Sequence, residues 1–423
     1  MAEAALAAGG RGARAGTPLL LAVAWRNLWR NARRTWLTAG GIAFAVMLIV
    51  FAMSFQQGAY VQMVDNSTGL LSGHLQVQSR DYVEDARFEQ TVEAVTHLVS
   101  RLERQPGIES AAPRVEAFAL VSAGERAFGA QVLGVDLERE RRTVRFLDRV
   151  AEGRPLAGSD DVMVGKILAK NLGIGPGNEI VLLGTGKEGG VAALALKVAG
   201  VFRTGIPDLD RAMVAAPIGA VQEAFGLGDE AHTIVVRTGS IADSERLARE
   251  LGGWLPDTLA ARNWGEVMPD VRQGIEIDRI GGYFVYGFIM IVVIFSVVNS
   301  FIMTVFERTR EFGMLRAIGM RPGRIMLMVQ VEAAGLWALG AGLGLALILP
   351  IVVWFEHHGL FIGEEMAAMA AELYVPDRLY TKSTAIGLGG APVVMLIGTQ
   401  VAALIPSLRI RRLRPVTALR AEE

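Results

Sequence analysis

Two glycine-rich stretches are the first candidates for nucleotide chemistry in this chain. The stretch GTGKEGG, which begins at Gly184, would need a glycine at position 181 to form a phosphate-binding loop, and Val181 stands there instead. The stretch LGIGPGNEI, which begins at Leu172, lacks the glycine spacing of a dinucleotide-binding turn. We interpret both stretches as ordinary turns, so the chain has no predicted nucleotide site.

Side chains that could act in metal, thiol or acid–base chemistry also lack a pattern. The chain has no cysteine, which excludes thiolate ligands and a thiol nucleophile. It has no Gly-x-Ser-x-Gly turn, and no two carboxylates have a spacing that indicates acid–base work. The five histidines lack HExxH-type spacing, so we expect no metal site, no catalytic residue and no bound cofactor. The histidines are His74, His97, His232, His357 and His358.

Four apolar segments indicate instead that the chain is built into a membrane. Its 423 residues are 52% hydrophobic and only 20% charged, which is too apolar for an ordinary soluble enzyme. Each segment is long enough, at ~1.5 Å per residue of helix, to cross a hydrocarbon core of ~30 Å. The first segment could be a cleaved signal peptide, but its length favours an uncleaved anchor. We place the spans at residues 36–56, 279–306, 325–355 and 385–408.

Arginines near the span ends predict the orientation. Arg26, Arg30, Arg33 and Arg34 precede the first span, several arginines lie in the segment 307–324, and the tail 409–423 is basic. The loop 356–384 is acidic. Because basic loops stay in the cytoplasm, both termini are predicted to be cytoplasmic, and the segments 57–278 and 356–384 to be extracytoplasmic.

The N-terminal segment 1–35 is predicted to be a cytoplasmic tail that leads into a helix on the membrane surface. The first sixteen residues are rich in Ala, Gly and Arg and are expected to be disordered. Leu21, Trp25, Leu28 and Trp29 lie near one helical face beside arginines, as in an interfacial helix. Contact with lipid headgroups is therefore the preferred explanation for these tryptophans.

The segment 57–278 has the pattern of an α+β domain. Short β-type runs begin at His74, Ile108, Ala127, Val162, Glu179 and Thr233, and segments with helical spacing lie at 91–104, 166–172, 217–225 and 240–255. The predicted fold class is therefore a membrane protein with four transmembrane α-helices and a large α+β extracytoplasmic domain between helices 1 and 2.

The stretch directly after the second span, ERTREFGMLRAIGM at 307–320, is the most specific motif in the chain. As a helix it would place Phe312, Leu315 and Ile318 on one apolar side and its charged residues elsewhere. Such a helix suits a short segment that lies on the membrane and docks into a protein partner. The alternative is a merely basic cytoplasmic loop.

This stretch resembles the ABC-transporter permease superfamily that includes the lipoprotein-releasing, macrolide-exporter and cell-division X proteins. The shared pattern is Glu-Arg, then Arg-Glu-x-Gly, then Leu-Arg-Ala-x-Gly, and every position is matched here. The likeness continues in AWRNLWRNARRTWLT, through the first span, and in the closing RIRRLRPVTALRAEE. The stretches SGHLQVQSRDY and VMVGKILAKNLGIGPGNEI look most like the lipoprotein-releasing branch.

The resemblance implies a transport subunit that is not itself an enzyme. A dimer of ATPase subunits would dock on the segment 307–324 and hydrolyse ATP, and a second permease, the same chain or a relative, would complete the assembly in a bacterial inner membrane. Its cargo would be a lipoprotein or another amphipathic substrate, passed to a periplasmic chaperone for outer-membrane sorting. Membrane lipids are further partners and nucleic acid is not. The residues assigned to ATPase coupling are Glu307, Arg308, Arg310, Glu311, Gly313, Leu315, Arg316 and Gly319.

Lipid-linked cargo would need a cavity, which the resemblance places between the first two spans of a permease pair, with ordinary lipid contact as the alternative. In the third span, Glu332 is expected to face protein, to be protonated or to snorkel toward the cytoplasm. Gly340 and Gly344 are expected to allow close helix packing, either within the chain or at a dimer seam. The candidate cavity residues are Phe44, Met47, Leu48, Phe51, Phe55, Tyr283, Phe284 and Phe288.

Other function classes stay open. The same ATP-driven movement could export a different compound, as in macrolide exporters, or activate a periplasmic hydrolase without transport. A membrane-bound enzyme would need a catalytic constellation in the exterior fold. ATP-dependent release of a lipoprotein from vesicles would favour transport, and activation of a partner enzyme without release would favour signalling.

Overall fold

The chain divides into two compact units. A computed structural model describes residues 24–82, 86–361, 363–364, 366 and 378–412. The helical unit comprises Met1–Tyr60, Glu276–Leu360 and Leu379–Glu423, and the sheet unit comprises Val61–Ile275 and Phe361–Arg378. The sixteen N-terminal residues predicted to be disordered, and residues 413–423 of the predicted tail, lie outside the described residues.

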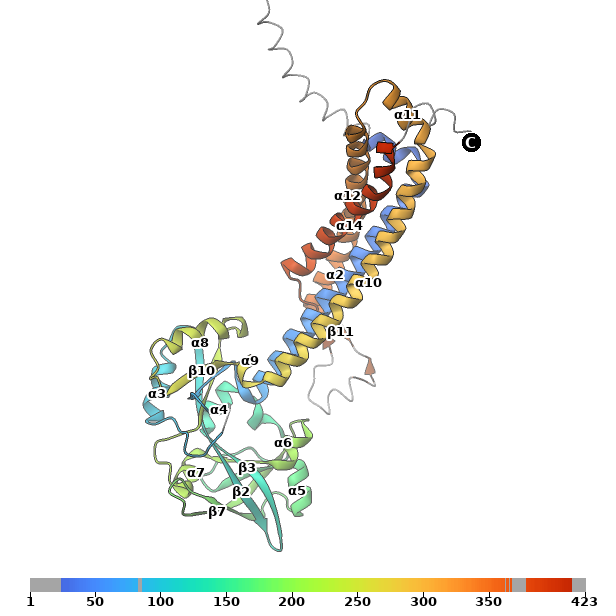
Figure 1. Cartoon of the computed structure of the whole chain (residues 1–423). Coiled ribbons are helices and arrows are strands. Elements are labelled where there is room, and N and C mark those ends of the chain that lie inside the picture. Colours follow the sequence, from blue (N-terminus) through green and yellow to red (C-terminus); the bar gives the residue numbers. More distant parts are fainter. Residues whose placement is uncertain (1–23, 83–85, 362, 365, 367–377, 413–423) are drawn as a thin grey trace, which may run out of the picture. The chain divides into compact units, whose positions relative to one another are not determined.

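Four long helices, drawn in Figure 1, are apolar and long enough to cross a membrane within the part of the chain that the structure describes. Together with the α+β sheet unit, they confirm the predicted fold class. All four extend beyond the predicted spans, and two of them do so by ten residues or more, α2 to Ser67 and α10 from Pro269. Apolarity marks only the part of a helix that lies in hydrocarbon, whereas helical hydrogen bonding continues into water. The helices are α2 (Ala32–Ser67), α10 (Pro269–Glu307), α12 (Pro322–His358) and α14 (Ala385–Arg412).

Small residues bring α12 against α2. A Cβ atom at Gly340 would lie 2.7 Å from the Ala39 carbonyl oxygen, and one at Gly344 would lie 2.7 Å from the Ala43 carbonyl oxygen. The two glycines therefore allow backbone-to-backbone contact, as small residues do between membrane helices. Of the two placements expected for these glycines, the structure shows the one within the chain.

Side-chain hydrogen bonds join the remaining helices of this unit. The indole Nε1 of Trp337 on α12 donates to the Pro392 carbonyl on α14 at 2.8 Å. Pro392 lies inside α14 and has no backbone N–H, so one hydrogen bond within that helix is missing. Between α2 and α10, the Thr38 hydroxyl donates to the Ser300 hydroxyl at 3.1 Å. Such hydrogen bonds hold helices together where lipid provides no hydrophobic driving force between them.

A short helix, α11 (Thr309–Ala317), connects α10 to α12. Arg308 is its N-cap residue, and Gly319 follows it with a φ of 97°, a conformation that suits glycine. Pro322 then opens α12 in the first turn, where its missing N–H costs nothing. Gly319 and Pro322 thus end one helix and start the next, which makes α11 a separate segment.

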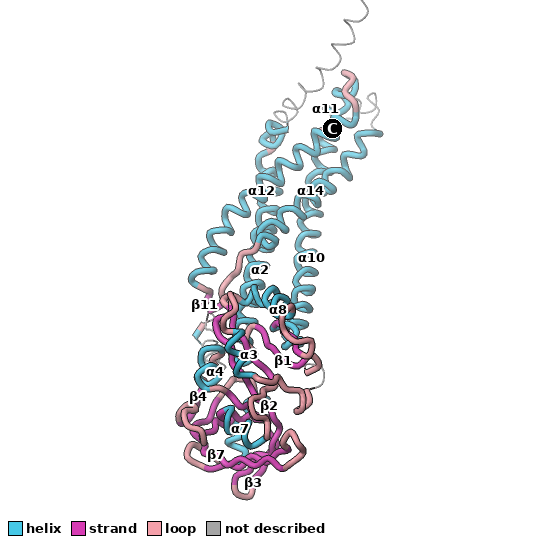
Figure 2. The backbone as a smooth tube through the Cα atoms, turned by 90° about the vertical axis from the view of Figure 1, so that its left-hand side faces the viewer, coloured by secondary structure: helices cyan, strands magenta, loops and turns pink. Residues whose placement is uncertain are grey.

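The sheet unit is built around a ten-stranded mixed sheet, visible in Figure 2. Six of its strands pair in a closed ring, β2–β3–β8–β5–β7–β6 and back to β2. The β3–β8 and β5–β7 pairs are parallel and the other pairs of the ring are antiparallel. The strands are β1 (Leu75–Ser79), β2 (Ile108–Ala123), β3 (Arg126–Val135), β4 (Val150–Gly153), β5 (Asp161–Gly165), β6 (Glu179–Thr185), β7 (Val191–Phe202), β8 (Met213–Pro217), β9 (Thr233–Thr238) and β10 (Leu259–Asn263).

Short helices cover this sheet, and their apolar sides join its strands in one main core. The predicted helix 166–172 has the observed bounds of α5, whereas α8 begins only at Ser244, because Ser240 caps a preceding 3-10 turn, Ile241–Asp243. The helices are α3 (Val95–Leu102), α4 (Leu137–Thr143), α5 (Lys166–Leu172), α6 (Pro207–Ala212), α7 (Ile218–Phe225), α8 (Ser244–Gly252) and α9 (Trp264–Val267), with a π-helical turn η1 (Thr68–Ser72) and two short strands, β11 (Leu360–Phe361) and β12 (Arg378–Leu379).

Both glycine-rich stretches are turns in the structure, as the sequence indicates. Gly173 ends α5 in the left-handed conformation with a φ of 73°. The stretch that begins at Gly184 connects β6 to β7, which pair as an antiparallel hairpin. Neither stretch leads from a strand into the N-terminus of a helix, which is the arrangement a nucleotide phosphate needs.

Candidate functional site

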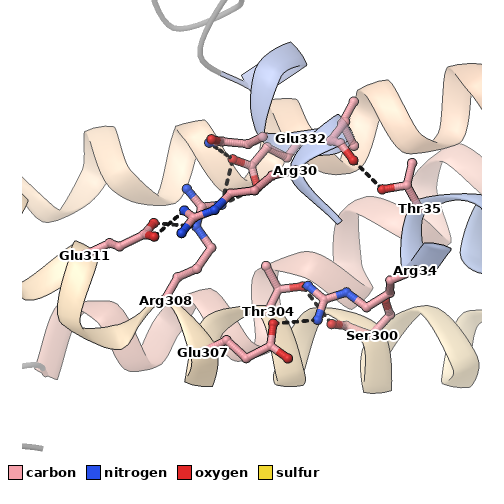
Figure 3. A network of polar contacts seen from close by, with 11 residues as sticks. Arg30, Arg34, Thr35, Ser300, Thr304, Glu307, Arg308, Glu311 and Glu332 are labelled. Atoms are coloured by element: carbon pink, nitrogen blue, oxygen red, sulfur yellow. Dashed lines mark hydrogen bonds and ion pairs between the residues drawn. The ribbon is translucent and has the colours of Figure 1, made fainter. Parts of the chain in front are cut away.

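A network of ion pairs gathers around α11 in the helical unit (Figure 3). Its members come from the segment before and at the start of α2, from the α10–α11 connection and from α12. Three arginines meet three glutamates, so the network is balanced in charge. They are Arg30, Arg34, Glu307, Arg308, Glu311 and Glu332.

Arg308 is the centre of this network. Its Nη1 donates to both carboxylate oxygens of Glu332 at 2.9 Å, and its Nε donates to Glu311 at 3.0 Å. The side chains of Arg308 and Glu332 are only 14% and 6% exposed. Asn27 donates a further hydrogen bond to Glu332 at 2.5 Å. Of the placements expected for Glu332, the structure therefore shows the one that faces protein, with a cationic partner.

The two other arginines attach the start of α2 to the same motif. Arg34 donates to the Glu307 carboxylate at 2.9 Å and also to the Thr304 hydroxyl. Arg30 forms an ion pair with Glu311. The Glu311 carboxylate therefore interacts with two guanidinium groups, those of Arg30 and Arg308. Each charge of the network has at least one partner of opposite sign. The side chains enclose a polar cavity of about 180 Å³.

Electrostatics at Glu311 follow from these contacts. Burial alone would raise the pKa of this carboxyl, but hydrogen bonds from Arg30 and Arg308 and their positive charges outweigh it and lower the pKa below its ordinary value. Glu311 is therefore held as a carboxylate between two guanidinium groups.

The residues predicted for ATPase coupling lie in two environments. Glu307, Arg308 and Glu311 form ion pairs within the network. Gly313 is buried, and Leu315 is half-buried against the helical core. Arg316 reaches the Ile410 carbonyl at 3.5 Å. Arg310 and Gly319 are exposed. The structure thus brings together only part of the predicted set.

The apolar side of α11 differs from the predicted one. Phe312 is fully buried in the helical core, but Ile318 is 79% exposed. Six residues of helix correspond to a rotation of about 240°, so these two side chains cannot share a face. The expectation for Ile318 was therefore wrong. The exposed residues of α11 and its C-cap form what we call the α11 patch: Arg310, Met314, Ala317 and Ile318.

Sequence reasoning missed Arg30, Arg34 and Asn27 as site residues. It used the two arginines only as indicators of membrane orientation, although their spacing of four residues places both on one helical face. That spacing, beside a motif with two glutamates, is the signal that could have identified them.

The eight predicted cavity residues do not form one group in this chain. Phe44, Leu48 and the three α10 residues Tyr283, Phe284 and Phe288 are exposed. Met47, Phe51 and Phe55 are half-buried, and the Phe51 ring stacks on Phe55 with 6.1 Å between centroids. A cavity between the first two spans remains a prediction.

Comparison with known protein families gives two matches. A model of the MacB-like periplasmic core domain matches residues 35–253, which is more than half of the chain. A model of the FtsX-like permease C-terminal region matches residues 283–415. The first match spans nearly all of α2 and most of the sheet unit, and the second spans α11 with the network residues Glu307, Arg308, Glu311 and Glu332.

Curated relatives agree with these matches. The lipoprotein-releasing system transmembrane protein LolC of Neisseria meningitidis is 23% identical, over 92% of this chain and 94% of the relative. The corresponding LolE of Haemophilus influenzae is 22% identical, over 90% and 93%. A macrolide export ATP-binding/permease protein, MacB, of Paracoccus denitrificans is 24% identical over 76% of this chain, which spans only 49% of that protein. The chain therefore belongs to the ABC-transporter permease superfamily with a MacB-like periplasmic core domain and an FtsX-like permease region, in its LolC-like branch.

Proposed function

We propose that this chain couples ATP hydrolysis on a separate ATPase dimer to movement of its periplasmic domain, and thereby releases lipoproteins from the inner membrane. The observation that carries the proposal is the α11 patch, an exposed, mainly apolar surface on a helix whose other side is fixed by Phe312 and by the ion-pair network. The LolC and LolE relatives, which are named for lipoprotein release and match nearly the whole chain, support the choice of cargo.

The α11 patch has the properties of a docking surface. Arg310, Met314 and Ile318 follow one another at four-residue spacing, so they lie along one side of the helix. Met314 is 50% exposed and Ile318 is 79% exposed. A short helix that presents apolar side chains with one arginine fits a groove on a partner protein. In the proposed orientation, with both termini cytoplasmic, this surface faces the compartment that contains ATP.

The ion-pair network would transmit movement of α11 to the long helices. Arg308 attaches α11 to α12 through Glu332, and Arg30 attaches the segment before α2 through Glu311. The helix α10 precedes α11 with Arg308 alone between them. A displaced α11 therefore acts on three membrane helices at once. Both α2 and α10 continue into the sequence of the sheet unit, which gives the displacement a covalent route to the periplasmic domain.

A second permease would complete the cargo site. Tyr283, Phe284 and Phe288 point away from the core of their own chain, since their exposed fractions are between 54% and 71%. They would become the wall of a cavity only when the helices of a second permease face them. Lipid acyl chains are the other apolar occupant of this surface.

An exposed apolar surface on the sheet unit could bind a soluble carrier for the released lipoprotein. Leu120 on β2 pairs with Leu183 on β6, and Thr185 on β6 pairs with Val191 on β7, so these side chains lie on one sheet face together with Phe118. Phe118 and Val191 are 81% and 87% exposed. Exposed apolar patches of this kind mark interaction sites, and they suit a carrier that shields acyl chains.

The proposal is tested by reconstituting the full chain with a lipoprotein-releasing-type ATPase subunit and, if required, a second permease. We expect Ile318→Asp and Met314→Asp to abolish copurification of the ATPase and the stimulation of its activity. Val191→Asp is the matched control, because it places the same charge on an exposed apolar site of the sheet unit. It should leave ATPase binding intact and reduce transfer of lipoprotein to a soluble carrier.

Two results would reject the proposal. Normal ATPase binding by both α11 variants would remove the coupling role of the patch. ATP-stimulated activity without any release of a lipoprotein, together with activation of a periplasmic hydrolase, would replace transport by signalling.

A further inference from the structure

A cavity of about 420 Å³ lies inside the sheet unit, on residues that the proposed coupling does not use. Its floor is the sheet itself. Gln78 on β1 pairs with Thr233 on β9, which pairs with Arg114 on β2, so the three side chains lie on one face. Glu116 lies on the same face two residues after Arg114. The cavity therefore has a polar floor on a sheet that is otherwise packed with apolar side chains.

Apolar side chains form the walls of this cavity. They come from the η1 turn, from β3, from the segment around α6, from α9 and from the start of α10. A polar floor beneath apolar walls is typical of sites that bind small amphipathic molecules, in which a few polar groups fix the orientation of the ligand. The wall residues that matter most are Leu71, Leu133, Leu209, Met213, Val267 and Val271.

Gln78 is a buried donor without a partner. Its side chain is 2% exposed, and its Nε2 makes no hydrogen bond to any of the described residues. The neighbouring Gln76 is different, because its Nε2 donates to the Ser72 carbonyl at 2.9 Å. A buried amide that lacks a hydrogen bond is costly, so its presence on the cavity floor indicates a missing acceptor.

Glu116 is the complementary acceptor. Its carboxylate receives hydrogen bonds from Thr233 at 3.2 Å, from Gln131 at 3.3 Å and from Tyr82 at 3.4 Å. All three are at the long end of the hydrogen-bond range, so the carboxylate can accept a further and shorter bond. Burial, and then the charge of Glu116, raise the pKa of Tyr82, so the phenol stays a donor at neutral pH.

Charge decides which head group the cavity accepts. Arg114 is neutralised by Glu140, whose carboxylate it meets through Nε at 3.1 and 3.2 Å. Among the described residues, the Glu116 carboxylate accepts hydrogen bonds only from the neutral donors Tyr82, Gln131 and Thr233, so the floor has a net negative charge. An anionic head group is therefore disfavoured. A head that both accepts and donates a hydrogen bond satisfies Gln78 and Glu116 together.

We propose that this cavity binds a small amphipathic molecule with an uncharged amide head and a single alkyl tail. The amide carbonyl accepts a hydrogen bond from Gln78 Nε2, the amide N–H donates to Glu116, and the tail lies among Leu71, Leu209 and Val267. Its volume lies near the lower end of the range for small-molecule sites, ~300–1,000 Å³. The ligand is thus distinct from a lipoprotein anchor with several acyl chains, and its binding does not depend on the proposed transport.

Equilibrium dialysis of octanamide against the full chain in nanodiscs tests this inference, with empty nanodiscs as the background. We expect saturable binding to the wild-type chain that is about tenfold weaker in Gln78→Met, because the ligand carbonyl loses its donor. Leu209→Trp should fill the cavity and abolish binding. Octanoate should bind at least tenfold more weakly than octanamide, because its charge opposes that of Glu116.

A matched glutamine separates a ligand role from a structural one. Gln222 on α7, outside the cavity lining, donates to the Glu230 carbonyl at 2.9 Å. Gln222→Met should lower the thermal midpoint and leave octanamide binding unchanged. Gln78→Met should keep or raise the thermal midpoint in the absence of ligand, because it removes an unsatisfied donor.

Three outcomes would overturn the inference. Equal uptake of octanamide by the wild-type chain, Gln78→Met and Leu209→Trp would mean that the probe only partitions into lipid. Tighter binding of octylamine than of octanamide would reject the amide head in favour of a cation. A lowered thermal midpoint in Gln78→Met, with octanamide binding intact, would make Gln78 a structural residue.

Discussion

The two units hold buried arginine–glutamate pairs in different ways. In the sheet unit, Arg114 on β2 and Glu140 on α4 are 3% and 0% exposed and bind each other through two donor atoms. In the helical unit, Arg308 divides its donors between Glu332 and Glu311, and Glu311 is shared with Arg30. The first arrangement is a closed pair, and the second is an open chain of partners.

This difference fits the coupling role proposed for the helical unit. A closed pair fixes one geometry, since either residue alone would be an unpaired buried charge. In an open chain of partners, one ion pair can lengthen while the same charged group stays paired with its second partner. The helices that provide the partners can therefore shift at modest cost in free energy. We therefore expect the sheet unit to keep its shape and the region around α11 to change its contacts more readily.

The largest effect is expected from breaking the closed pair. Glu140→Gln removes the negative charge and leaves Arg114 buried without a counterion, so the sheet unit should lose about 3–5 kcal/mol of stability. Hydrogen exchange of the amides in β2, measured by mass spectrometry on the full chain, reports this loss. Glu138→Gln, on the same helix with 87% of its side chain exposed, is the control and should change stability by less than about 0.5 kcal/mol. A loss below about 1 kcal/mol at Glu140 would contradict the comparison.

A smaller loss of stability is expected at the open chain. Glu332→Gln leaves Arg308 paired with Glu311, and the new amide oxygen still accepts a hydrogen bond, so we expect a loss of about 1–2 kcal/mol. Coupling should suffer more than stability, because the route from α11 to α12 is weakened. The charge exchange Arg308→Glu with Glu332→Arg should restore part of the ATPase stimulation. A destabilisation equal to that of Glu140→Gln would show that the helical network is as rigid as the sheet pair.

The next effect is a pH dependence confined to the sheet unit. His232 is fully buried, its Nε2 lies 2.9 Å from the Phe88 carbonyl, and its Nδ1 accepts from the Glu116 backbone N–H at 3.0 Å. Burial lowers the pKa of His232 below its ordinary value. The unfolded chain then binds a proton that the folded chain does not, so this contribution to stability is complete above about pH 6.5 and declines as the pH falls toward the folded pKa.

Substitution of this histidine gives the measurement. Stability followed by hydrogen exchange between pH 7.5 and 5 should decrease on acidification with a slope of at most about 1.4 kcal/mol per pH unit for each histidine. His232→Gln should remove part of the slope. His74 also contributes to the slope, because burial and the charge of Arg237 lower the pKa of its imidazole. An unchanged slope in His232→Gln would show that its proton affinity is ordinary.

The smallest effect is expected from an exposed pair of the same chemistry. Arg237 and Glu109 meet at 3.1 Å, with 41% and 53% of their side chains exposed. Water screens such pairs, so Glu109→Gln should change stability by less than about 0.5 kcal/mol. A thermal melt in 0.05 M and 0.5 M salt checks this, because added salt should make the wild type and the variant alike. A loss above about 1 kcal/mol would break the ranking by burial.

The elements of the fold were predictable where the periodicity is strong. The short apolar run in EIVLL gave β6, and the valine-rich runs VMVG and TIVVR gave β5 and β9. The strand β7 was missed, because VAALALKVAGVF is rich in Ala and its second half, Val198–Phe202, is buried on both faces, which hides the alternation. The strand β8 was missed for a similar reason, since MVAAP is short and made of small residues.

The candidate site was predictable as a motif and not as a geometry. The helix at 309–317 lies inside the predicted stretch, but the partners of its charges come from far along the chain. Arg30 and Glu311 are separated by 281 residues, and such a contact has no local signal. The same limit applies to Gln78, since an alternating strand has two faces and its sequence alone does not tell which one is covered.

The contact between α2 and α12 has a consequence for how this sequence can drift over evolutionary time. Any side chain at Gly340 or Gly344 would collide with the backbone of α2, so both positions are closed to substitution unless the helices part. Gly342, on the same helix, has open space where a Cβ atom would be added. We therefore expect larger residues to be tolerated at Gly342, and changes at Gly340 or Gly344 to require that α2 and α12 move apart.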